Sequence, residues 1–284
     1  MSDPNVRRFG HDAMATRFEL TLVHDSAGEA ARAAQAVWDD IDSLEQQLSR
    51  YVPWSDIGRL NGNSAGRVVE IANAAMDCLS YGKEVWEQTG GAFDVTIGPL
   101  LPVLRWSDGA PRKATKQEID EARARCGYGL LDIDMEAMTV TPRADNMLID
   151  LGAIGKGYAL DQAAMLLREQ WSISNALLNA GTSTILAMGA RPGHDGWLVR
   201  AGAPEPFALK DQAVSGTGFQ VKGAHVIDPR SAKLVDLRRI IRWSIAPSAT
   251  LADALSTAFM VMNRREITSF LKQYPDVQCL FVED

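Results

Sequence analysis

Cysteine is scarce in this sequence, with three residues among 284. Cys78, Cys126 and Cys279 lie far apart and form no CxxC pair, so their spacing indicates neither a disulfide framework nor a zinc site. Long apolar runs are also lacking, and the first residues contain neither a signal-peptide core nor a lipobox-like cysteine. We therefore expect a cytoplasmic protein without membrane insertion, although a trimmed exported chain would look the same.

An excess of positive charge is missing too. Lysine and arginine number 29 against 36 aspartates and glutamates, which gives a net charge of −7 and argues against nucleic acid or an anionic membrane as a partner. The chain contains no repeat, low-complexity tract or linker. Its length and 46% hydrophobic content predict one domain over residues 1–284, which can be built as two closely packed lobes.

Several well-known catalytic motifs are absent. The sequence has no GxSxG elbow and no HExxH helix, which argues against a Ser-His-Asp enzyme and a zinc hydrolase. The segment GAIGKG (152–157) matches neither a Walker loop nor the dinucleotide pattern GxGxxG. It does join an expected strand to an expected helix, where N-terminal amides and Lys156 favour an anion. The alternative is a left-handed turn that carries a surface lysine.

The hydrophobic pattern predicts an α+β fold with mixed or antiparallel sheets and packed helices. Apolar residues recur every three or four positions between Gly28 and Leu48, which is typical of an amphipathic helix. A second helix is expected from Asn73, as its cap, to the glycines at 90 and 91. The other expected elements are a strand at 17–23, a hairpin at 130–142, a short buried strand at 147–152, a helix from the GAIGKG segment through Leu167, strands at 175–181, 183–189, 197–202 and 238–246, a helix capped by Ser248 or Thr250, a helix at 265–274 and a strand at 279–283.

Asp253 and Thr257 lie four residues apart in the apolar helical run TLADALST (250–257). This spacing places the carboxylate and the hydroxyl on one side of a helix. Hard oxygen ligands of this kind suit Mg²⁺. The alternative is a capping aspartate with a threonine that bonds back to its own helix. If the pair serves as ligands and not as core, Asp253→Ala is expected to abolish Mg²⁺-dependent turnover and leave the fold intact.

Two further segments combine residues that can carry chemistry. Phe93 and Asp94 follow two glycines in the loop AFDVTIGP, where they either hold a flat heterocycle or serve as a core residue and a cap. His225 precedes Asp228 and Pro229 in HVIDP, and it is either a catalyst or a structural histidine beside a turn. The residues alone leave both choices open.

Taken together, these segments resemble the ApbE-type flavin transferases, which are FAD:protein FMN transferases. The resemblance spans nearly the whole chain and rests on MATRF (14–18), SRY with SDIGRLN (49–61), GGAFDVTIGPL (90–100), DLGAIGKGYALD (150–161), NAG (179–181), HVIDP (225–229) and ADALSTAF (252–259). It implies a T-fold-type, two-lobed single unit. It also implies that Mg²⁺ assists cleavage of the FAD pyrophosphate, with FMN passing to a Thr or Ser hydroxyl of an acceptor protein and AMP released. Some relatives hydrolyse FAD to FMN and AMP or only bind it, so an FAD pyrophosphatase and a non-catalytic FAD-binding protein are the alternatives.

The resemblance assigns roles to individual residues. It implies a metal site made of the Ala153 carbonyl and the side chains of Asp253 and Thr257. His225 is the candidate to accept the proton of the acceptor hydroxyl, oriented by Asp228, while Lys156 offsets charge on the leaving AMP. The implied flavin contacts are Met14, Tyr51, Ala92, Phe93, Asp94, Lys156 and Ile227.

The chain departs from the usual family pattern at four places. Ala15 replaces a glycine, which is a modest change if the backbone there keeps a negative φ. Thr182 also replaces a glycine, and its side chain narrows the flavin cleft or adds a hydroxyl. The stretch around Gly216 is followed by a short segment to His225, which shortens the wall that faces the acceptor. Ser231 and Ala232 replace Thr-Gly, which indicates a different turn.

Overall fold

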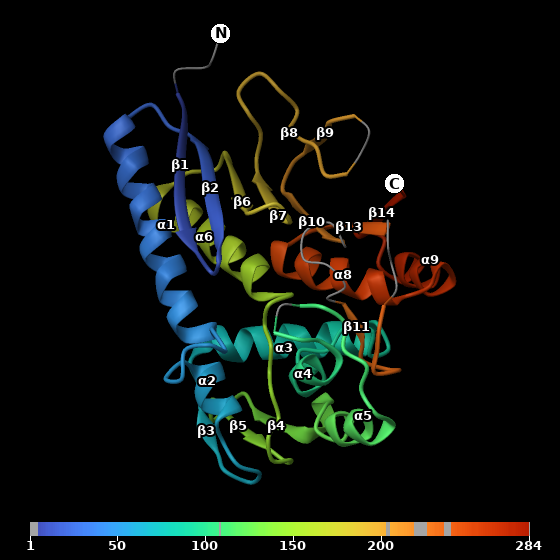
Figure 1. Cartoon of the computed structure of the whole chain (residues 1–284). Helices are drawn as coiled ribbons and strands as arrows, with labels where there is room; N and C mark the ends of the chain where they lie inside the picture. The colour runs from blue at the N-terminus through green and yellow to red at the C-terminus, as the bar shows by residue number, and fades with distance from the viewer. Residues whose placement is uncertain (1–4, 108, 203–204, 219–225, 236–239, 284) are drawn as a thin grey trace.

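The computed structural model describes residues 5–107, 109–202, 205–218, 226–235 and 240–283. Its largest element is a seven-stranded sheet, and a smaller three-stranded sheet lies at the opposite end of the molecule (Figure 1). The named strands pair in antiparallel fashion within the described residues. The expected α+β class is therefore confirmed.

The strand order of the large sheet brings distant parts of the chain together. Hydrogen-bonded neighbours follow the order β1 (Val6–Ala13), β2 (Thr16–Val23), β6 (Ala176–Ala180), β7 (Thr184–Met188), β10 (Gln212–Gly218), β13 (Ile240–Ala246) and β14 (Gln278–Glu283). The smaller sheets are β3 (Val69–Glu70), β5 (Thr139–Pro142) and β4 (Leu131–Asp134), then β8 (Trp197–Val199) with β9 (Phe207–Leu209), and β11 (Ile227–Asp228) with β12 (Lys233–Leu234).

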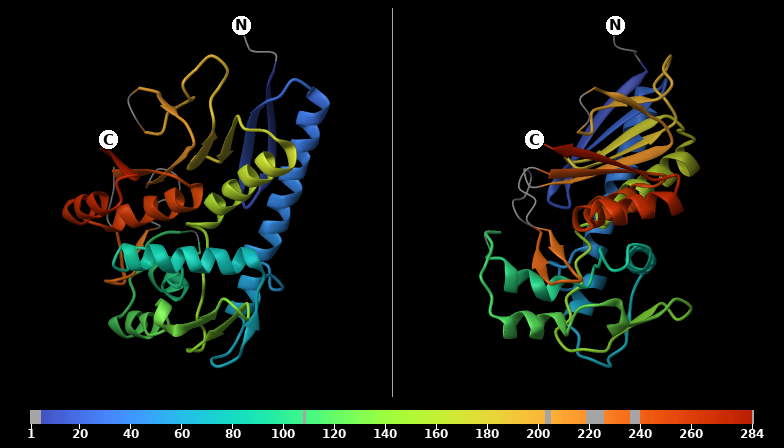
Figure 2. Two further views of the ribbon diagram at one scale, coloured as in Figure 1. Left: turned by 180° about the vertical axis from the view of Figure 1, so that it is seen from behind. Right: turned by 90° about the vertical axis from the view of Figure 1, so that its right-hand side faces the viewer.

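Helices cover one face of the large sheet, and the side view in Figure 2 separates the strands from α6 and α8. α8 packs directly on β10, β13 and α6. The helices are α1 (Ala27–Leu48), α2 (Asp56–Asn61), α3 (Asn73–Gln88), α4 (Leu101–Leu104), α5 (Lys116–Arg123), α6 (Gly155–Trp171), α8 (Ala249–Val261) and α9 (Arg264–Gln273). Among the described residues, no helix is both long and apolar enough to cross a bilayer.

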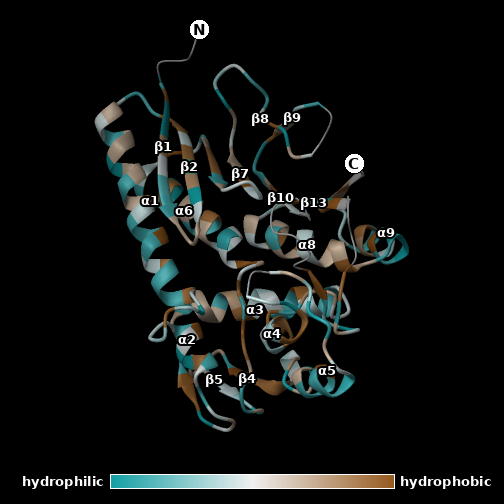
Figure 3. Cartoon of the chain, in the orientation of Figure 1, coloured by the Kyte–Doolittle hydropathy of each residue, from teal (hydrophilic) through white to brown (hydrophobic). Residues whose placement is uncertain are grey.

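The predicted amphipathic character of α1 is confirmed. Its larger apolar residues, among them Val37, Ile41 and Leu44, are buried, and the charged positions between them are exposed or partly exposed. In Figure 3, teal hydrophilic stretches accordingly alternate along α1 with stretches coloured white to brown. The helix begins after Ser26, whose Oγ accepts a hydrogen bond from the amide of Glu29 at 3.3 Å. Capping and one buried face are the usual requirements for a stable helix at a protein surface.

One continuous core links the two ends of the molecule. Leu20 and Leu178 of the large sheet belong to the same cluster of buried residues as Val69 and Val140 of the three-stranded sheet. Leu79 on α3 lies in this cluster as well and is fully buried. The two parts therefore share their hydrophobic stabilisation.

Two details of the expected secondary structure are wrong. Ala72, not Asn73, is the N-cap of α3, and it makes no side-chain capping bond. Residues 147–152 form no regular strand, because Leu148 makes only an isolated bridge with Ile97. The Asp150 amide instead donates to the Val95 carbonyl at 2.8 Å. The AFDVTIGP loop thus satisfies the Leu148 carbonyl and the Asp150 amide, while the Asn61 side chain pairs with the amide and the carbonyl of Ile149.

The turn between β1 and β2 adopts a conformation that alanine disfavours. Ala13 pairs with Thr16, so Met14 and Ala15 are the two loop residues, and their φ angles are 48° and 56°. Two-residue hairpin loops with positive φ at both positions usually contain Asn-Gly. Ala15 therefore does not have the negative φ that would make its replacement of the family's glycine a modest change. Ala232 likewise has a φ of 52° at the position where the family usually has glycine.

Replacement of Ala15 by glycine is expected to raise the free energy of unfolding by about 1 kcal/mol, because glycine enters the left-handed region without a Cβ clash. The Ala15 side chain is exposed, so its loss removes no core contact. Urea denaturation measures the effect. The matched control is Ala31→Gly on the exposed side of α1, which is expected to lower stability by about 1 kcal/mol. Equal effects of the two changes would contradict this prediction.

Candidate active site

The N-terminal turns of α6 and α8 approach each other closely at Gly157. A Cβ built on Gly157 would lie 2.2 Å from the Ala249 carbonyl oxygen, so the contact requires glycine at this position. The residue has a negative φ, as do the other glycines of the GAIGKG segment. The alternative of a left-handed turn is therefore wrong, and close packing of the two helices explains Gly157.

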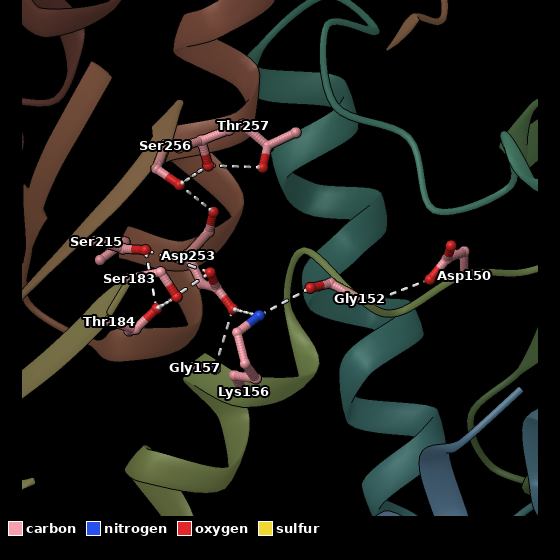
Figure 4. A network of polar contacts seen from close by, with 12 residues as sticks. Asp150, Gly152, Lys156, Gly157, Ser183, Thr184, Ser215, Asp253, Ser256 and Thr257 are labelled. Atoms are coloured by element: carbon pink, nitrogen blue, oxygen red, sulfur yellow. Dashed lines mark hydrogen bonds and ion pairs between the residues drawn. The ribbon is translucent and has the colours of Figure 1, made fainter. Parts of the chain in front are cut away.

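Asp253 lies in this contact with both carboxylate oxygens engaged (Figure 4). Its side chain is 6% exposed, and Oδ2 accepts a hydrogen bond from the Gly157 amide at 3.2 Å. Oδ1 accepts from the hydroxyls of Thr184 on β7 and Ser215 on β10, both at 3.3 Å. Asp253 thus caps the N-terminus of α6 and not of its own helix, and the positive end of the α6 dipole stabilises its charge.

Lys156 supplies the positive charge of the site. Its Nζ donates to the Gly152 carbonyl at 2.9 Å and lies 3.6 Å from Asp253 Oδ2. The side chain is 17% exposed, so the ammonium is largely withdrawn from solvent. Figure 4 places it between the Gly152 turn and the Asp253 carboxylate. The alternative of a surface lysine is therefore wrong.

Thr257 follows Asp253 by one helical turn, as the spacing predicts. Its Oγ1 lies 3.3 Å from Oγ1 of Thr217 on β10. The hydroxyl that bonds back along α8 belongs to Ser256, which donates to the Asp253 carbonyl at 2.8 Å. The alternative of a back-bonding Thr257 is therefore wrong.

The donor groups around Asp253 fit a hard cation. They are one carboxylate, the hydroxyls of Thr184 and Ser215 and, beyond the Lys156 ammonium, the Gly152 carbonyl, and all are oxygen ligands of the kind that Mg²⁺ prefers. Within the described ranges, no group of three or more His, Cys, Asp or Glu side chains could hold a metal ion. A metal here would rely on Asp253, Thr257 and the Ala153 carbonyl. The ammonium against Asp253 indicates that this position favours positive charge.

Asp161 is a site residue that the sequence reasoning missed. It lies on α6 and accepts hydrogen bonds from the Ala249 and Thr250 amides of α8, both at 2.8 Å. Burial raises the pKa of Asp161, and hydrogen bonds from Thr250 and Ala249 act against this shift. Asp161 of α6 therefore caps α8, while Asp253 of α8 caps α6. The only signal in the sequence was its place at the end of DLGAIGKGYALD.

A chain of polar contacts leads from this site to Tyr51. The Asp150 carboxylate accepts from the Gly152 amide at 2.9 Å and lies 3.4 Å from Arg50 Nε. Arg50 donates to the Tyr51 hydroxyl at 2.6 Å, and its guanidinium lies 4.5 Å from the centre of that ring. Tyr51 is 78% exposed as a residue, so the ring face opposite Arg50 is free to stack on a ligand. The sequence reasoning missed both Arg50 and Asp150.

Ala92, Phe93 and Asp94, which are predicted to contact the flavin, are buried. Ala92 and Phe93 are 1% and 2% exposed and belong to the main core. Asp94 Oδ1 accepts from the amide and the hydroxyl of Thr96, both at 2.7 Å. Burial raises the pKa of Asp94, whereas the bonds from Thr96 lower it. This placement matches the interpretation of a core phenylalanine, whereas Asp94 closes a turn at Thr96 and caps no helix.

The HVIDP segment is only partly described. His225 lies outside the described residues, so its pairing with Asp228 stays a prediction. The Asp228 carboxylate accepts from the Arg230 amide at 3.0 Å, from Arg230 Nε at 3.2 Å and from the Ser231 hydroxyl at 3.0 Å. Ile227 is buried in a small cluster with Leu100 and Leu104.

The remaining predicted positions lie near β2 and β10. Met14 is half-buried in the β1–β2 turn, and a Cβ on Gly181 would lie 2.2 Å from Thr16 Oγ1 in the same turn. Thr182 is exposed. Gly216 makes room for the indole of Trp243, because a Cβ there would come within 2.6 Å of the ring.

A cavity of about 530 Å³ lies between the large sheet and the β7–β8 loop. Arg8, Arg191, His194 and Trp197 are among its lining residues. None of the predicted site residues lines it. The contacts around Asp253, and not this cavity, therefore define the candidate active site.

The family model described as "ApbE family" matches residues 14–281. The chain belongs to the ApbE family. Solved members have the same fold, and the apo form of the Pseudomonas stutzeri flavinyl transferase ApbE matches with a TM-score of 0.86 and 24% identity over 98% of this chain and 91% of that one. The ApbE protein of Thermotoga maritima matches with a TM-score of 0.82 and 26% identity over 98% of this chain and 94% of that one.

Curated ApbE-family relatives are similar over most of their length. The FAD:protein FMN transferase of Salmonella typhimurium is 26% identical over 92% of this chain and 79% of its own length. The FAD:protein FMN transferase of Treponema pallidum is 25% identical over 90% of this chain and 78% of its own length. The resemblance found in the sequence motifs is thus confirmed at the level of family and fold.

Proposed function

We propose that this ApbE-family protein is a Mg²⁺-dependent FAD:protein FMN transferase. An acceptor Thr or Ser hydroxyl attacks the FMN phosphorus of FAD, the pyrophosphate bond to AMP breaks, and AMP leaves. The hydroxyl proton passes to a base, for which His225 is the candidate. Family membership and the curated relatives support this activity.

The observation that carries the proposal is the pairing of Lys156 with Asp253 at the N-terminus of α6. A lysine, a carboxylate and helix amides that converge at one point are suited to a pyrophosphate and a cation. Bound Mg²⁺ would supply charge neutralisation at the phosphate oxygens. Lys156 contributes a positive charge, and the exposed face of Tyr51 is available to the isoalloxazine ring.

Incubation of the purified protein with FAD, Mg²⁺ and a peptide that carries a Thr flavinylation site tests the proposal. We expect AMP and a peptide whose mass has increased by that of FMN less one water, since transfer forms a phosphoester bond. EDTA is expected to prevent formation of both products. Chromatography of the nucleotides and mass spectrometry of the peptide measure the outcome.

A control without peptide distinguishes the other activities considered. FMN and AMP formed at the same rate without peptide would indicate an FAD pyrophosphatase instead. Unchanged FAD that remains bound after prolonged incubation with Mg²⁺ and peptide would indicate an FAD-binding protein. Either result would overturn the transferase proposal.

A further inference from the structure

The Lys156 ammonium occupies the space in which a cation bound to Asp253 would lie. It is held by the Gly152 carbonyl at 2.9 Å and faces Asp253 Oδ2 at 3.6 Å. The opposite oxygen, Oδ1, accepts from the hydroxyls of Thr184 and Ser215, and Oδ2 accepts from the Gly157 amide at 3.2 Å. Because the ammonium lies on the side of Oδ2, this is the oxygen at which an ammonium and a metal ion would compete.

Two cations cannot share this position at low cost. Asp253 and Lys156 are both largely buried, so solvent screens the repulsion between a divalent ion and an ammonium only in part. Asp253 is the only acidic side chain within ion-pair distance of Lys156 among the described residues. Lysine has a flexible four-carbon stem that allows its charge to move away.

We infer that Lys156 is a resident cation of the metal-free site and leaves Asp253 when a divalent cation binds. This inference rests on the proposed metal-dependent function. Without metal, Lys156 neutralises the Asp253 carboxylate. With metal, the released ammonium is available to the phosphates of FAD, so one lysine serves two anions in turn.

Binding of Mn²⁺ alone to the FAD-free protein, followed by electron paramagnetic resonance, tests the inference. Lys156→Met is expected to tighten Mn²⁺ binding at least about fivefold, the factor for two unit charges 4 Å apart even in bulk water. Lys156→Arg retains the charge and is expected to bind Mn²⁺ within about twofold of the unchanged protein. Arg50→Met is the matched control, because it removes one positive charge from the same polar chain without a contact to Asp253. It is expected to alter Mn²⁺ binding less than about twofold.

Unchanged or weaker Mn²⁺ binding by Lys156→Met would overturn the inference, as would an equal gain in Arg50→Met. A crystal structure with Mn²⁺ against Asp253 and Lys156 still bonded to the Gly152 carbonyl would overturn it as well. Absence of Mn²⁺ binding in every variant would also overturn the inference. The transferase assay is separate: metal-dependent AMP formation without the expected gain in affinity rejects this inference alone, and the expected gain without AMP formation rejects only the proposed function.

Discussion

Asp253→Asn is expected to lower metal-dependent AMP release from FAD about a thousandfold. Among the described residues, Asp253 carries the only negative charge that faces Lys156, and the loss of several kcal/mol of charge stabilisation corresponds to such a factor. The asparagine oxygen can still accept from Thr184 and Ser215, so we expect the fold to be retained. Rates of AMP formation and a thermal melt measure the two effects. Asp132→Asn, an exposed acid on β4, is the control and is expected to leave both unchanged.

Asp253→Ala is expected to do more than remove a ligand. It leaves the Gly157 amide without its acceptor and the Lys156 ammonium without its counter-charge in a buried place, which costs about 3 kcal/mol or more. The sequence alone predicts that this variant keeps its fold. Because Asp253 both caps α6 and faces the lysine, we now expect the variant to be destabilised as well as inactive. Activity retained in Asp253→Asn within tenfold would contradict the metal-site assignment.

Gly157→Ala is expected to destabilise the protein although it improves the local helix propensity. The propensity gain is at most about 1 kcal/mol. The new Cβ would lie 2.2 Å from the Ala249 carbonyl oxygen and 2.8 Å from the Thr250 amide nitrogen, which are backbone atoms that Asp161 holds in place. Separation of α6 from α8 costs about 3 kcal/mol or more, so the net loss is about 2 kcal/mol or more. Guanidinium denaturation measures this loss.

Gly155 provides the matched control on the same helix. A Cβ on Gly155 has its nearest neighbour, the Leu151 Cβ, at 3.9 Å, which is an ordinary contact. Gly155→Ala is therefore expected to keep or raise stability by up to about 1 kcal/mol. Opposite signs for Gly157→Ala and Gly155→Ala support close packing of the two helices, and equal signs would contradict it.

Local patterns in the sequence predicted local structure well. The spacing of Val37, Ile41 and Leu44 determines which face of α1 is buried, and Ser248 caps α8 as one of the two residues expected. The Asp253–Thr257 spacing placed both residues on one side of α8. Each of these features depends on neighbours in the same helix.

Features that depend on distant segments could not be predicted. Thr184 and Ser215 reach Asp253 only because β7 and β10 pair in the large sheet, and no local pattern indicates that pairing. Asp161 caps a helix that lies 88 residues away in sequence at Ala249. The left-handed turn at Ala15 was missed because alanine gives no signal for positive φ, and the strand register imposes it.

The N-termini of α6 and α8 are hydrogen-bonded to each other through Asp253 and Asp161, so each terminus is fully satisfied only when the other helix is in place. Asp161 and Asp253 come from different thirds of the chain, yet each accepts from first-turn amides of the other helix. For α8 this adds to the local cap Ser248, whereas α6 has no side-chain cap at its own N-cap residue. During synthesis, α6 leaves the ribosome long before α8 and must wait for its cap. The site can therefore take shape only once almost the entire chain has emerged, and a truncated product that ends before α8 would have no means of assembling it.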